Sequence, residues 1–309
     1  MQATEGSQSW KIPDRSVVMS LGNFDGVHRG HQVVFRELTN RAKASNACSL
    51  VYTFEPHPVK ILSPESPFLL IQTREQKIAS ITQCGVDHII LEPFTAEFAH
   101  MGAEDFFNEV IVKRITPKEI VVGYDFTFGS HRSGTVQLLQ QLGQKAGIPV
   151  TIVNAQFDHE TLLSSSVIRQ RIVAGDIDGA NVLLGRPYEL TGTIVKGRGL
   201  GKQIGFATAN LSSLNECIPA PGIYVTRFTY DNTSEPSVTY IGRNPTLGAT
   251  ELAIETHVLS AVPELFGKHA SVYFLSRIRG EQKFSGREEL TAAIAHDCQE
   301  AINYHATHK

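Results

Sequence analysis

The chain has 309 residues, of which 41% are hydrophobic and 19% charged, and its formal net charge is −3. This length suits two domains, and the composition is that of a globular protein that can bury a sizeable core. Up to Gly185 the chain has 16 Lys and Arg against 19 Asp and Glu, and beyond it 12 against 12. Neither half therefore has the basic composition typical of a protein that binds nucleic acid or an anionic membrane.

The four cysteines are separated by 36, 133 and 81 residues along the chain: Cys48, Cys84, Cys217 and Cys298. No CxxC pair or other zinc-ligand spacing occurs, and the spacing does not indicate a disulfide framework. Residues 1–15 lack the basic start and apolar stretch of a signal peptide, and no apolar run approaches the length of a membrane span. We therefore expect a cytoplasmic protein with reduced thiols.

Between Ser16 and Gly185, short apolar segments alternate with longer helical ones. The apolar segments are rich in β-branched residues and predict strands at 17–22, 48–54, 87–94, 119–126 and 149–157. Helical spacing of apolar side chains predicts helices at 31–45, 74–84, 103–114 and 134–146, and a closing helix at 165–184. Because these strands are apolar throughout and helices follow them, we expect a parallel α/β sheet covered on both faces.

Beyond a linker at 185–190 the pattern changes. Strand segments now follow one another without intervening helices, at 191–197, 222–230, 237–243, 253–259 and 270–278. Ser285 and Glu288 form an S-x-x-E capping box that predicts a helix ending near Tyr304. This order favours an antiparallel β-barrel with one carboxy-terminal helix. We therefore expect two domains, at 16–185 and 186–309.

The segment LGNFDGVHRGHQ (21–32) joins the first predicted strand to the first predicted helix, where α/β sheets bind ligands. His28 and His31 are three residues apart across Gly30, so both imidazoles can face the same way on the first helical turn. Such a pair can donate hydrogen bonds to phosphate oxygens that gain charge in phosphoryl transfer. A bare HxGH is also compatible with two surface histidines, but its place after a strand and a glycine turn favours a phosphate site.

Three more polar segments share this setting at strand ends or a helix start. TFEPHP (53–58) ends the second strand, GYDFTFG (123–129) follows the fourth, and SSSVIR (164–169) opens a helix. Serines alone commonly cap helices. Hydroxyls, the N–H groups of a helix start and an arginine can together bind an anion.

GNFDGVHRGH, TFEPHP, GYDFTFG and SSSVIR resemble, in this order and spacing, the adenylyltransferase module of the bacterial bifunctional riboflavin kinase/FMN adenylyltransferase family, the FAD synthetases. The resemblance implies a Rossmann-like nucleotidylyltransferase domain that makes FAD from FMN and ATP. It assigns ATP and catalysis to His28, His31, Arg169, Gly22, Asn23, Phe24, Asp25, Gly30, Ser165 and Ser166. It assigns the flavin to Pro56, His57, Pro58 and Asp125. Ser166 stands where the family usually has threonine, which keeps the hydroxyl.

The second half carries a glycine-rich segment, GTIVKGRGLGKQIGFATANL (192–211), that leads to Thr208 and Asn210. Backbone N–H groups of such a loop suit phosphates, and these two side chains offer hard oxygen ligands to Mg²⁺. A glycine-rich hairpin without function explains the local pattern equally well. In AIETHVL (253–259), Glu255 and His257 share one face of a strand. Glu255 there is either a base for an alcohol or a carboxylate on the solvated face.

GFATAN, GIYV, YIGRNPT, ETHVL, ELFGK and IRGEQKF resemble the riboflavin kinase module of the same family in order. The resemblance implies a six-stranded barrel that phosphorylates riboflavin with Mg²⁺ and ATP. It assigns Mg·ATP to Thr208 and Asn210, the catalytic base to Glu255 and a flavin contact to Arg279. The ATP-binding loop would comprise Gly197, Gly199, Gly201, Lys202 and Gly205. Ala207 stands where the family has proline.

The two resemblances together predict a bifunctional transferase of flavin cofactor synthesis. Its partners would be the small molecules riboflavin, FMN and ATP, without nucleic acid or membrane. One alternative is an FMN adenylyltransferase whose barrel only binds flavin, because of the changes around Ala207. The other is a flavin-responsive regulator without turnover. A pure binder needs neither the HxGH pair nor Glu255, which argues against the regulator.

Overall fold

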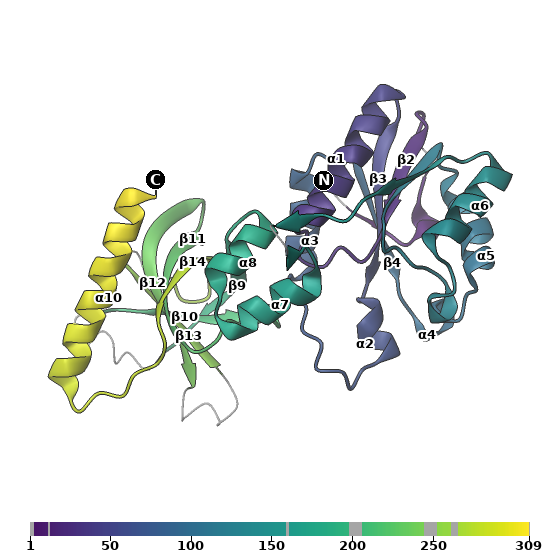
Figure 1. Cartoon of the computed structure of the whole chain (residues 1–309). Helices are drawn as coiled ribbons and strands as arrows, with labels where there is room; N and C mark the ends of the chain where they lie inside the picture. The colour runs from purple at the N-terminus through teal and green to yellow at the C-terminus, as the bar shows by residue number, and fades with distance from the viewer. Residues whose placement is uncertain are drawn as a thin grey trace. The chain divides into compact units, whose positions relative to one another are not determined.

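In the computed structural model of the protein, the described residues are 3–11, 13–158, 161–197, 206–243, 252–260 and 265–308. They divide into two compact units, one up to Ser165 and one from Ser166 onward (Figure 1). The first unit is an α/β sheet and the second contains a β-barrel, which confirms both expected architectures. The domain boundary expected at 185/186 stays a prediction, although residues 166–185 belong to the second unit here.

The first unit is built on a six-stranded sheet in the order β1-β4-β3-β2-β5-β6. Every neighbouring pair of strands is parallel, as expected. The strands are β1 (Thr4–Glu5), β2 (Val17–Leu21), β3 (Cys48–Glu55), β4 (His88–Pro93), β5 (Glu119–Gly123) and β6 (Val150–Val153). The two-residue strand β1 was not expected from the sequence.

Helices cover both faces of this sheet (Figure 1). Val18 and Met19 of β2 are both fully buried, and they belong to apolar clusters on opposite faces. The cluster around Val18 includes α1 (Arg29–Ala44) and α3 (Arg74–Gln83); the other includes the π-helical segment η2 (Phe106–Ile115) and α6 (Val136–Ala146). Short helical segments lie in the connections: η1 (Ser7–Ser9), α2 (Pro58–Leu62), α4 (Ala96–Ala99), α5 (Ala103–Asp105) and η3 (Ser130–Arg132).

The order of the strands reverses direction between β2 and β5. From β2 the chain winds outward through β3 to β4, and it then returns to β5 on the other side of β2 and continues to β6. The loops after β2 and β5 therefore diverge, and they leave a crevice outside the carboxyl ends of these two strands. The HxGH segment follows β2 and the GYDFTFG segment follows β5, so both expected ligand segments lie at this crevice.

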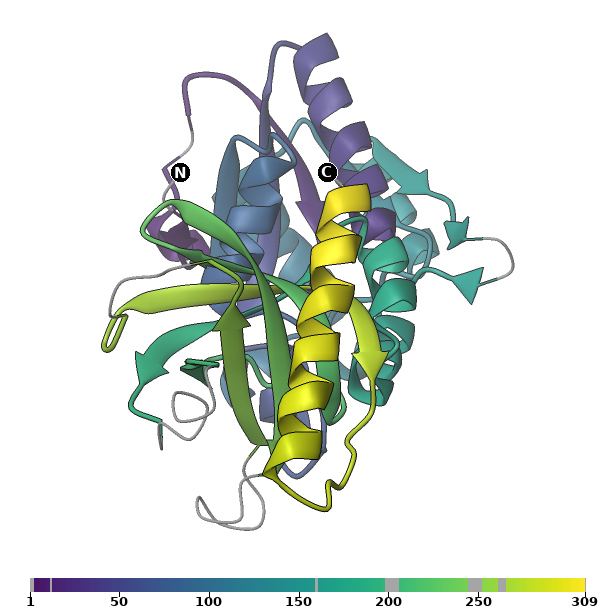
Figure 2. The same cartoon turned by 90° about the vertical axis from the view of Figure 1, so that its left-hand side faces the viewer.

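The second unit contains a β-barrel (Figure 2). It is closed and antiparallel, with the strand order β10-β13-β12-β11-β14-β9. Its strands are β9 (Tyr188–Val195), β10 (Ala209–Ser213), β11 (Gly222–Tyr230), β12 (Thr233–Arg243), β13 (Leu252–Val258) and β14 (His269–Arg279). This confirms the six strands that the family resemblance implied. β9 begins inside the expected linker, and the sequence pattern alone missed β10. A further antiparallel pair, β7 (Phe157–Asp158) and β8 (Thr161–Leu162), precedes the second unit.

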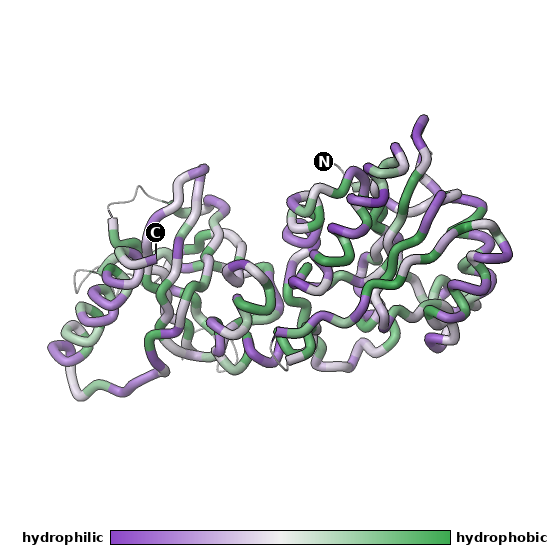
Figure 3. Tube along the Cα trace, turned by 45° about the horizontal axis from the view of Figure 1, so that its top comes forward, coloured by the Kyte–Doolittle hydropathy of each residue, from purple (hydrophilic) through white to green (hydrophobic). Residues whose placement is uncertain are grey.

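The carboxy-terminal helix α10 (Arg287–Thr307) packs on β11 and β12. Hydrophobic and hydrophilic residues alternate along it (Figure 3), and Cys298 and Ala301 face the barrel. The expected capping box of Ser285 with Glu288 is wrong. Gly286 is the N-cap, so the third helical position is Glu289, whose carboxylate accepts from the Ser285 N–H and hydroxyl. Of the helices in the described ranges, none is both long and apolar enough to cross a membrane.

The single helix expected at 165–184 is two helices, α7 (Ser165–Ala174) and α8 (Ile177–Leu184). Gly175 has φ +79°, a conformation that ends a helix and suits glycine. Asp176 then caps α8, because its carboxylate accepts the Gly179 N–H at 3.0 Å. Asn181 joins α8 to the barrel: its amide donates to the Phe274 carbonyl at 2.8 Å, and its side-chain oxygen accepts the Tyr188 N–H at 2.7 Å.

These contacts predict that a fragment of residues 166–309 is more stable than one of residues 186–309. The shorter fragment lacks Asn181, and it exposes the barrel surface that α8 covers. In the longer fragment, the buried apolar side chains of α8 contribute about 1.5–3 kcal/mol each to the free energy of unfolding. Thermal unfolding of both fragments, followed by circular dichroism, should give a clearly lower Tm for the shorter one. Equal melting temperatures of the two fragments would instead support the domain boundary expected at 185/186.

Candidate active sites of the two units

The HxGH segment forms a tight turn between β2 and α1. His28 is the N-cap of α1, and its Nδ1 accepts the His31 N–H at 3.4 Å. The two imidazole rings stack with their centroids 3.6 Å apart, so they face the same way, as the spacing predicted. A Cβ on Gly30 would lie 3.0 Å from the His28 ring, which leaves little room there for any larger residue. Phe24 packs edge-on against His31 at 5.2 Å.

The backbone of this turn is strained. Phe24 and Val27 both have positive φ, at 51° and 40°, which costs energy in residues with a side chain. Asp25 holds the turn in place: its buried carboxylate accepts the Ile71 N–H at 3.1 Å. The Asp25 carbonyl accepts from the Ser165 hydroxyl at 2.8 Å. Ser165 therefore reaches the HxGH turn across 140 residues of sequence, whereas Ser166 and Arg169 follow on α7 in the second unit.

The TFEPHP segment ends β3 and starts α2. The Glu55–Pro56 peptide bond is cis. His57 caps α2, because its Nδ1 accepts the Val59 N–H at 3.2 Å, and its ring stacks on Phe68 with centroids 4.8 Å apart. These contacts give His57 a structural role in the turn. Pro58 lines a cavity, described next, that neither Pro56 nor His57 lines.

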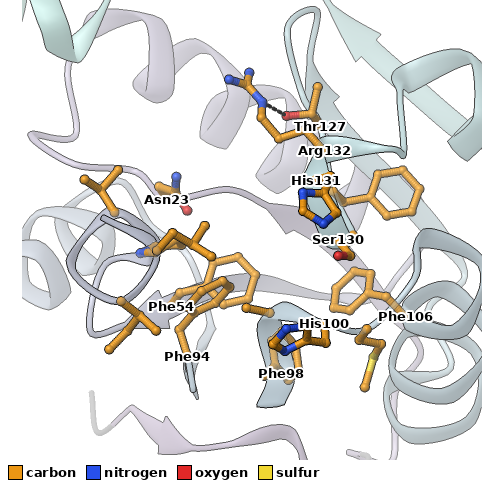
Figure 4. A pocket seen from close by; sticks show the side chains of 18 of the residues that line it. Asn23, Phe54, Phe94, Phe98, His100, Phe106, Thr127, Ser130, His131 and Arg132 are labelled. Carbon is orange, nitrogen blue, oxygen red and sulfur yellow. Dashed lines mark hydrogen bonds between the residues drawn. The ribbon is translucent and has the colours of Figure 1, made fainter. Parts of the chain in front are cut away.

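An aromatic cavity of about 820 Å³ lies at the carboxyl edge of the sheet (Figure 4). Its walls come from the ends of β2, β3 and β4, from η2 and from the segment after β5. Six phenylalanine rings line it: Phe54, Phe94, Phe98, Phe106, Phe126 and Phe128. Phe126 and Phe128 stack with centroids 5.6 Å apart, and Phe54 contacts Phe94 and Phe98. Apolar walls of this kind accept a flat aromatic ligand.

Polar groups also line the same cavity (Figure 4). They are Asn23, Thr127, Ser130, His131, Arg132 and His100. Arg132 Nε donates to Thr127 Oγ1 at 3.0 Å, and both His131 and Arg132 have positive φ. Asn23 belongs to the HxGH segment, so the cavity adjoins the histidine pair. Asp125 is exposed and does not line the cavity.

Sequence reasoning missed this cavity, although the signal was present. Phe54, Phe94, Phe126 and Phe128 all lie at or just after the carboxyl end of a strand. In a parallel sheet these ends meet at one edge, so aromatic residues there must gather.

In the barrel, strand register brings Asn210 and Glu255 together. They are direct partners in the β10–β13 pair, and Glu255 is also the partner of Tyr240 in β12. Directly opposite residues share a face of the sheet. A Cβ on Gly197 would lie 2.2 Å from Asn210 Nδ2, so this end of the glycine-rich loop lies against the same side chain. Gly199, Gly201, Lys202 and Gly205 lie outside the described residues.

Glu255 lies on the outer face of the barrel. The interior contains hydroxyl groups instead: Thr239 Oγ1 contacts Thr226 Oγ1 at 2.8 Å and Thr256 Oγ1 at 2.9 Å, all fully or almost fully buried. Because Thr256 points inward, Glu255 beside it points outward. Tyr240 on the same outer face belongs to the cluster beneath α10. Glu255 is half-buried there, and it shares its strand face with His257 as expected.

Three neighbours shape this outer site. The pKa of the Tyr240 hydroxyl is raised by burial, then by its 2.7 Å hydrogen bond to Glu281, and further by the charge of Glu255. Tyr240 therefore stays protonated and cannot serve as a base near neutral pH. His257 Nδ1 lies 2.8 Å from the Ala207 carbonyl, which fixes the backbone just before Thr208.

Arg279 is tied to the carboxy-terminal helix. Its guanidinium donates to both carboxylate oxygens of Asp297 in α10, at 2.9 and 2.7 Å, and it lies 5.7 Å from the centre of the Phe284 ring. Asp297 is almost fully buried. This bidentate ion pair gives Arg279 a structural function at the end of β14, in addition to the flavin contact expected from the sequence.

The chain matches two family models, one described as FAD synthetase over residues 11–167 and one described as riboflavin kinase over residues 184–305. Curated relatives are named bifunctional riboflavin kinase/FMN adenylyltransferase. The one from Bacillus subtilis (strain 168) is 36% identical, and the one from Escherichia coli (strain K12) is 34% identical; each match covers 93% of this chain and 92% of the relative. The resemblance expected from the sequence motifs is thereby confirmed.

A solved structure titled as a macrolide-efflux protein from Streptococcus pneumoniae is also similar, with a TM-score of 0.88 and 32% identity. The match covers 96% of this chain and 97% of that one. Its title names a different activity from the two family models and the curated relatives, which agree with one another over both halves of the chain. The protein belongs to the family of bacterial bifunctional riboflavin kinases/FMN adenylyltransferases.

Proposed function

We propose that the aromatic cavity of the first unit binds the flavin ring of FMN, and that the His28–His31 turn binds the phosphates of ATP beside it. As a member of this family, the chain catalyses two reactions: riboflavin and ATP give FMN and ADP, and FMN and ATP give FAD and pyrophosphate. The observation that carries the proposal is that Asn23 belongs both to the HxGH turn and to the cavity wall. One crevice can thus hold both substrates of the second reaction.

The histidine geometry suits the phosphates of ATP. Because Nδ1 of His28 accepts a hydrogen bond, Nε2 is the ring nitrogen that can donate to a phosphate oxygen. The N-terminus of the 16-residue helix α1 adds its partial positive charge to this site. In the reaction, an oxygen of the FMN phosphate attacks the α-phosphorus of ATP, and the bond to the β-phosphate breaks to release pyrophosphate. The site would act by orienting these groups and neutralising the charge on the leaving phosphates.

The kinase reaction belongs to the outer face of the barrel. Glu255 would accept the proton of the riboflavin 5′-hydroxyl as its oxygen attacks the γ-phosphorus of ATP, and ADP leaves. Its place directly opposite Asn210 supports this role, since the register puts the carboxylate beside the residue proposed to hold Mg·ATP. Ala207 stands where the family has proline, and its carbonyl is bound to His257. This contact holds the backbone just before Thr208, which supports a working kinase despite the substitution.

The donor set around Asn210 fits Mg²⁺. It consists of the Thr208 hydroxyl and the Asn210 side-chain carbonyl, and Mg²⁺ prefers such oxygen ligands while it keeps waters and substrate phosphates. Among the described residues no group of three or more His, Cys, Asp or Glu could hold a metal by itself. Thr208 and Asn210 would hold it, and its charge would neutralise the ATP phosphates. All four cysteines are unbridged, which supports a cytoplasmic protein.

Replacing His28 or His31 by Ala should reduce FAD formation from FMN at least about 100-fold, because a donor to a developing phosphate charge is lost. Riboflavin phosphorylation in the same molecule should be unchanged. His88→Ala is the matched control, because His88 lies at the opposite, amino end of β4. Undiminished FAD synthesis in the His28 and His31 variants, measured by chromatography of the flavins, would contradict the assignment.

Phe54→Leu should weaken FMN binding in adenylyl transfer, because leucine fills the wall but cannot stack on a flavin. Loss of one aromatic pair corresponds to about 0.5–1.5 kcal/mol, so the KM for FMN should rise roughly 2- to 12-fold. The KM for ATP should stay at the parent value. An unchanged KM for FMN would show that the flavin lies elsewhere.

Glu255→Gln should slow riboflavin phosphorylation by about 10²–10⁴-fold, because glutamine keeps the shape but removes the base. FMN supplied directly should still become FAD. Glu281→Gln is the control, since this carboxylate also neighbours Tyr240 but is proposed to have no catalytic part. If the Glu281 variant loses the activity and the Glu255 variant keeps it, the base is misassigned.

A further inference from the structure

Lys77 is a buried lysine on α3 that neither proposed reaction uses. Its side chain is 9% exposed, and its Nζ donates to the Phe54 carbonyl at 2.9 Å and lies 3.4 Å from a carboxylate oxygen of Glu55. Burial lowers the pKa of Lys77, and the charges of Glu55 and Asp25 oppose that shift. A buried lysine is costly unless it is paired, so its contacts need an explanation.

The strand pattern explains why the Phe54 carbonyl needs this donor. Along β3, the Tyr52 carbonyl accepts the Gly22 N–H at 3.2 Å from the end of β2. The Phe54 carbonyl, two residues on, points to the same side of the strand. There β2 has already ended at Leu21 and its chain has turned away into the HxGH segment, so no strand can supply a donor. The Lys77 ammonium donates the hydrogen bond that the N–H of a neighbouring strand would otherwise supply to this carbonyl.

The same helix also supports the HxGH turn. The segment that enters α3 contains Ile71, whose N–H binds the Asp25 carboxylate and whose side chain packs against Gly26. Six residues later, Lys77 binds the end of β3 and is within electrostatic reach of Asp25. One short stretch of chain thus contacts both the proposed ATP-binding turn and the strand end that carries the proposed flavin-binding Phe54.

We propose that Lys77 is a positioning residue for adenylyl transfer, which holds the Phe54 end of β3 and the Glu55–Pro58 turn in register with the His28–His31 turn. This inference rests on the proposed flavin site in the aromatic cavity. Lys77 contacts no proposed substrate position itself. It acts through Phe54, whose ring lines the cavity and contacts Phe94 and Phe98. A displacement of about 1 Å between reacting groups can slow a reaction on the order of 100-fold, so small shifts of this strand end matter.

The test compares Lys77→Met with Lys77→Arg in the full-length chain. Methionine keeps the length and apolar stem of the side chain but removes the charge and the donor, whereas arginine keeps both. The kcat/KM for FMN in FAD synthesis should fall about 10- to 100-fold in K77M and recover most of this loss in K77R. The KM for ATP should stay within about twofold of the parent, because the Ile71–Asp25 contact still holds the HxGH turn.

Ile81→Val is the matched control for a purely structural effect, because Ile81 is a fully buried residue one turn further along α3. It should lower the Tm without changing the KM for FMN. Circular dichroism of each variant reports whether the first unit is folded, and riboflavin phosphorylation, which the barrel carries out in the same molecules, serves as the activity that the substitutions should leave unchanged. If K77M does not fold, Lys77→Gln replaces it, since glutamine is neutral and too short to span the same distance.

Two results would overturn the proposal: a parent-like kcat/KM for FMN in the neutral variant, or an equal loss of FMN and ATP affinity. Phe54→Leu separates this failure from a failure of the flavin site. If Phe54→Leu weakens FMN binding while K77M does not, the cavity binds FMN and Lys77 has no positioning role. If neither variant affects FMN, the cavity assignment itself is wrong.

Discussion

The reversal of strand order between β2 and β5 is the constraint on which the first active site depends. Parallel strands end at one edge of a sheet, and at the point of reversal their connections diverge and leave a crevice. The HxGH turn fills one side of that crevice, and the aromatic segment after β5 lines the other. The strain at Phe24 and Val27 can persist because Asp25, Ile71 and Ser165 hold the turn between them.

In the barrel, the register of the strand pairing determines which side chains form the site. Register places Asn210, Glu255 and Tyr240 side by side, and the alternation of the strand sends Thr256 inward and Glu255 outward. The buried threonine hydroxyls satisfy one another, so the interior needs no charge. The bidentate Arg279–Asp297 pair joins α10 to the end of β14; removing one partner of such a buried pair typically costs about 3–5 kcal/mol.

The sequence predicted the elements whose signals are local. Long apolar strands, the HxGH spacing and the Glu255–His257 alternation were all found in the structure, although the strands expected at 119–126 and 149–157 already end at Gly123 and Val153. The aromatic cavity and the contacts of Lys77 were missed, because they join residues from several strands and one helix that no local spacing relates. β1 is too short for a periodic signal, and β10 is too polar. The break at Gly175 and Asp176 could have been predicted, since glycine followed by a capping residue commonly separates two helices.

In the proposed arrangement, one crevice of the first unit holds FMN in the aromatic cavity and ATP at the histidine turn. A crystal structure of the full-length protein with FMN and a non-hydrolysable ATP analogue tests it most directly. We expect the flavin ring between the phenylalanines of the cavity, the analogue's phosphates at His28 and His31, and the FMN phosphate facing the α-phosphorus. A flavin ring bound in the first unit but outside the cavity, or phosphates away from both histidines, would contradict it.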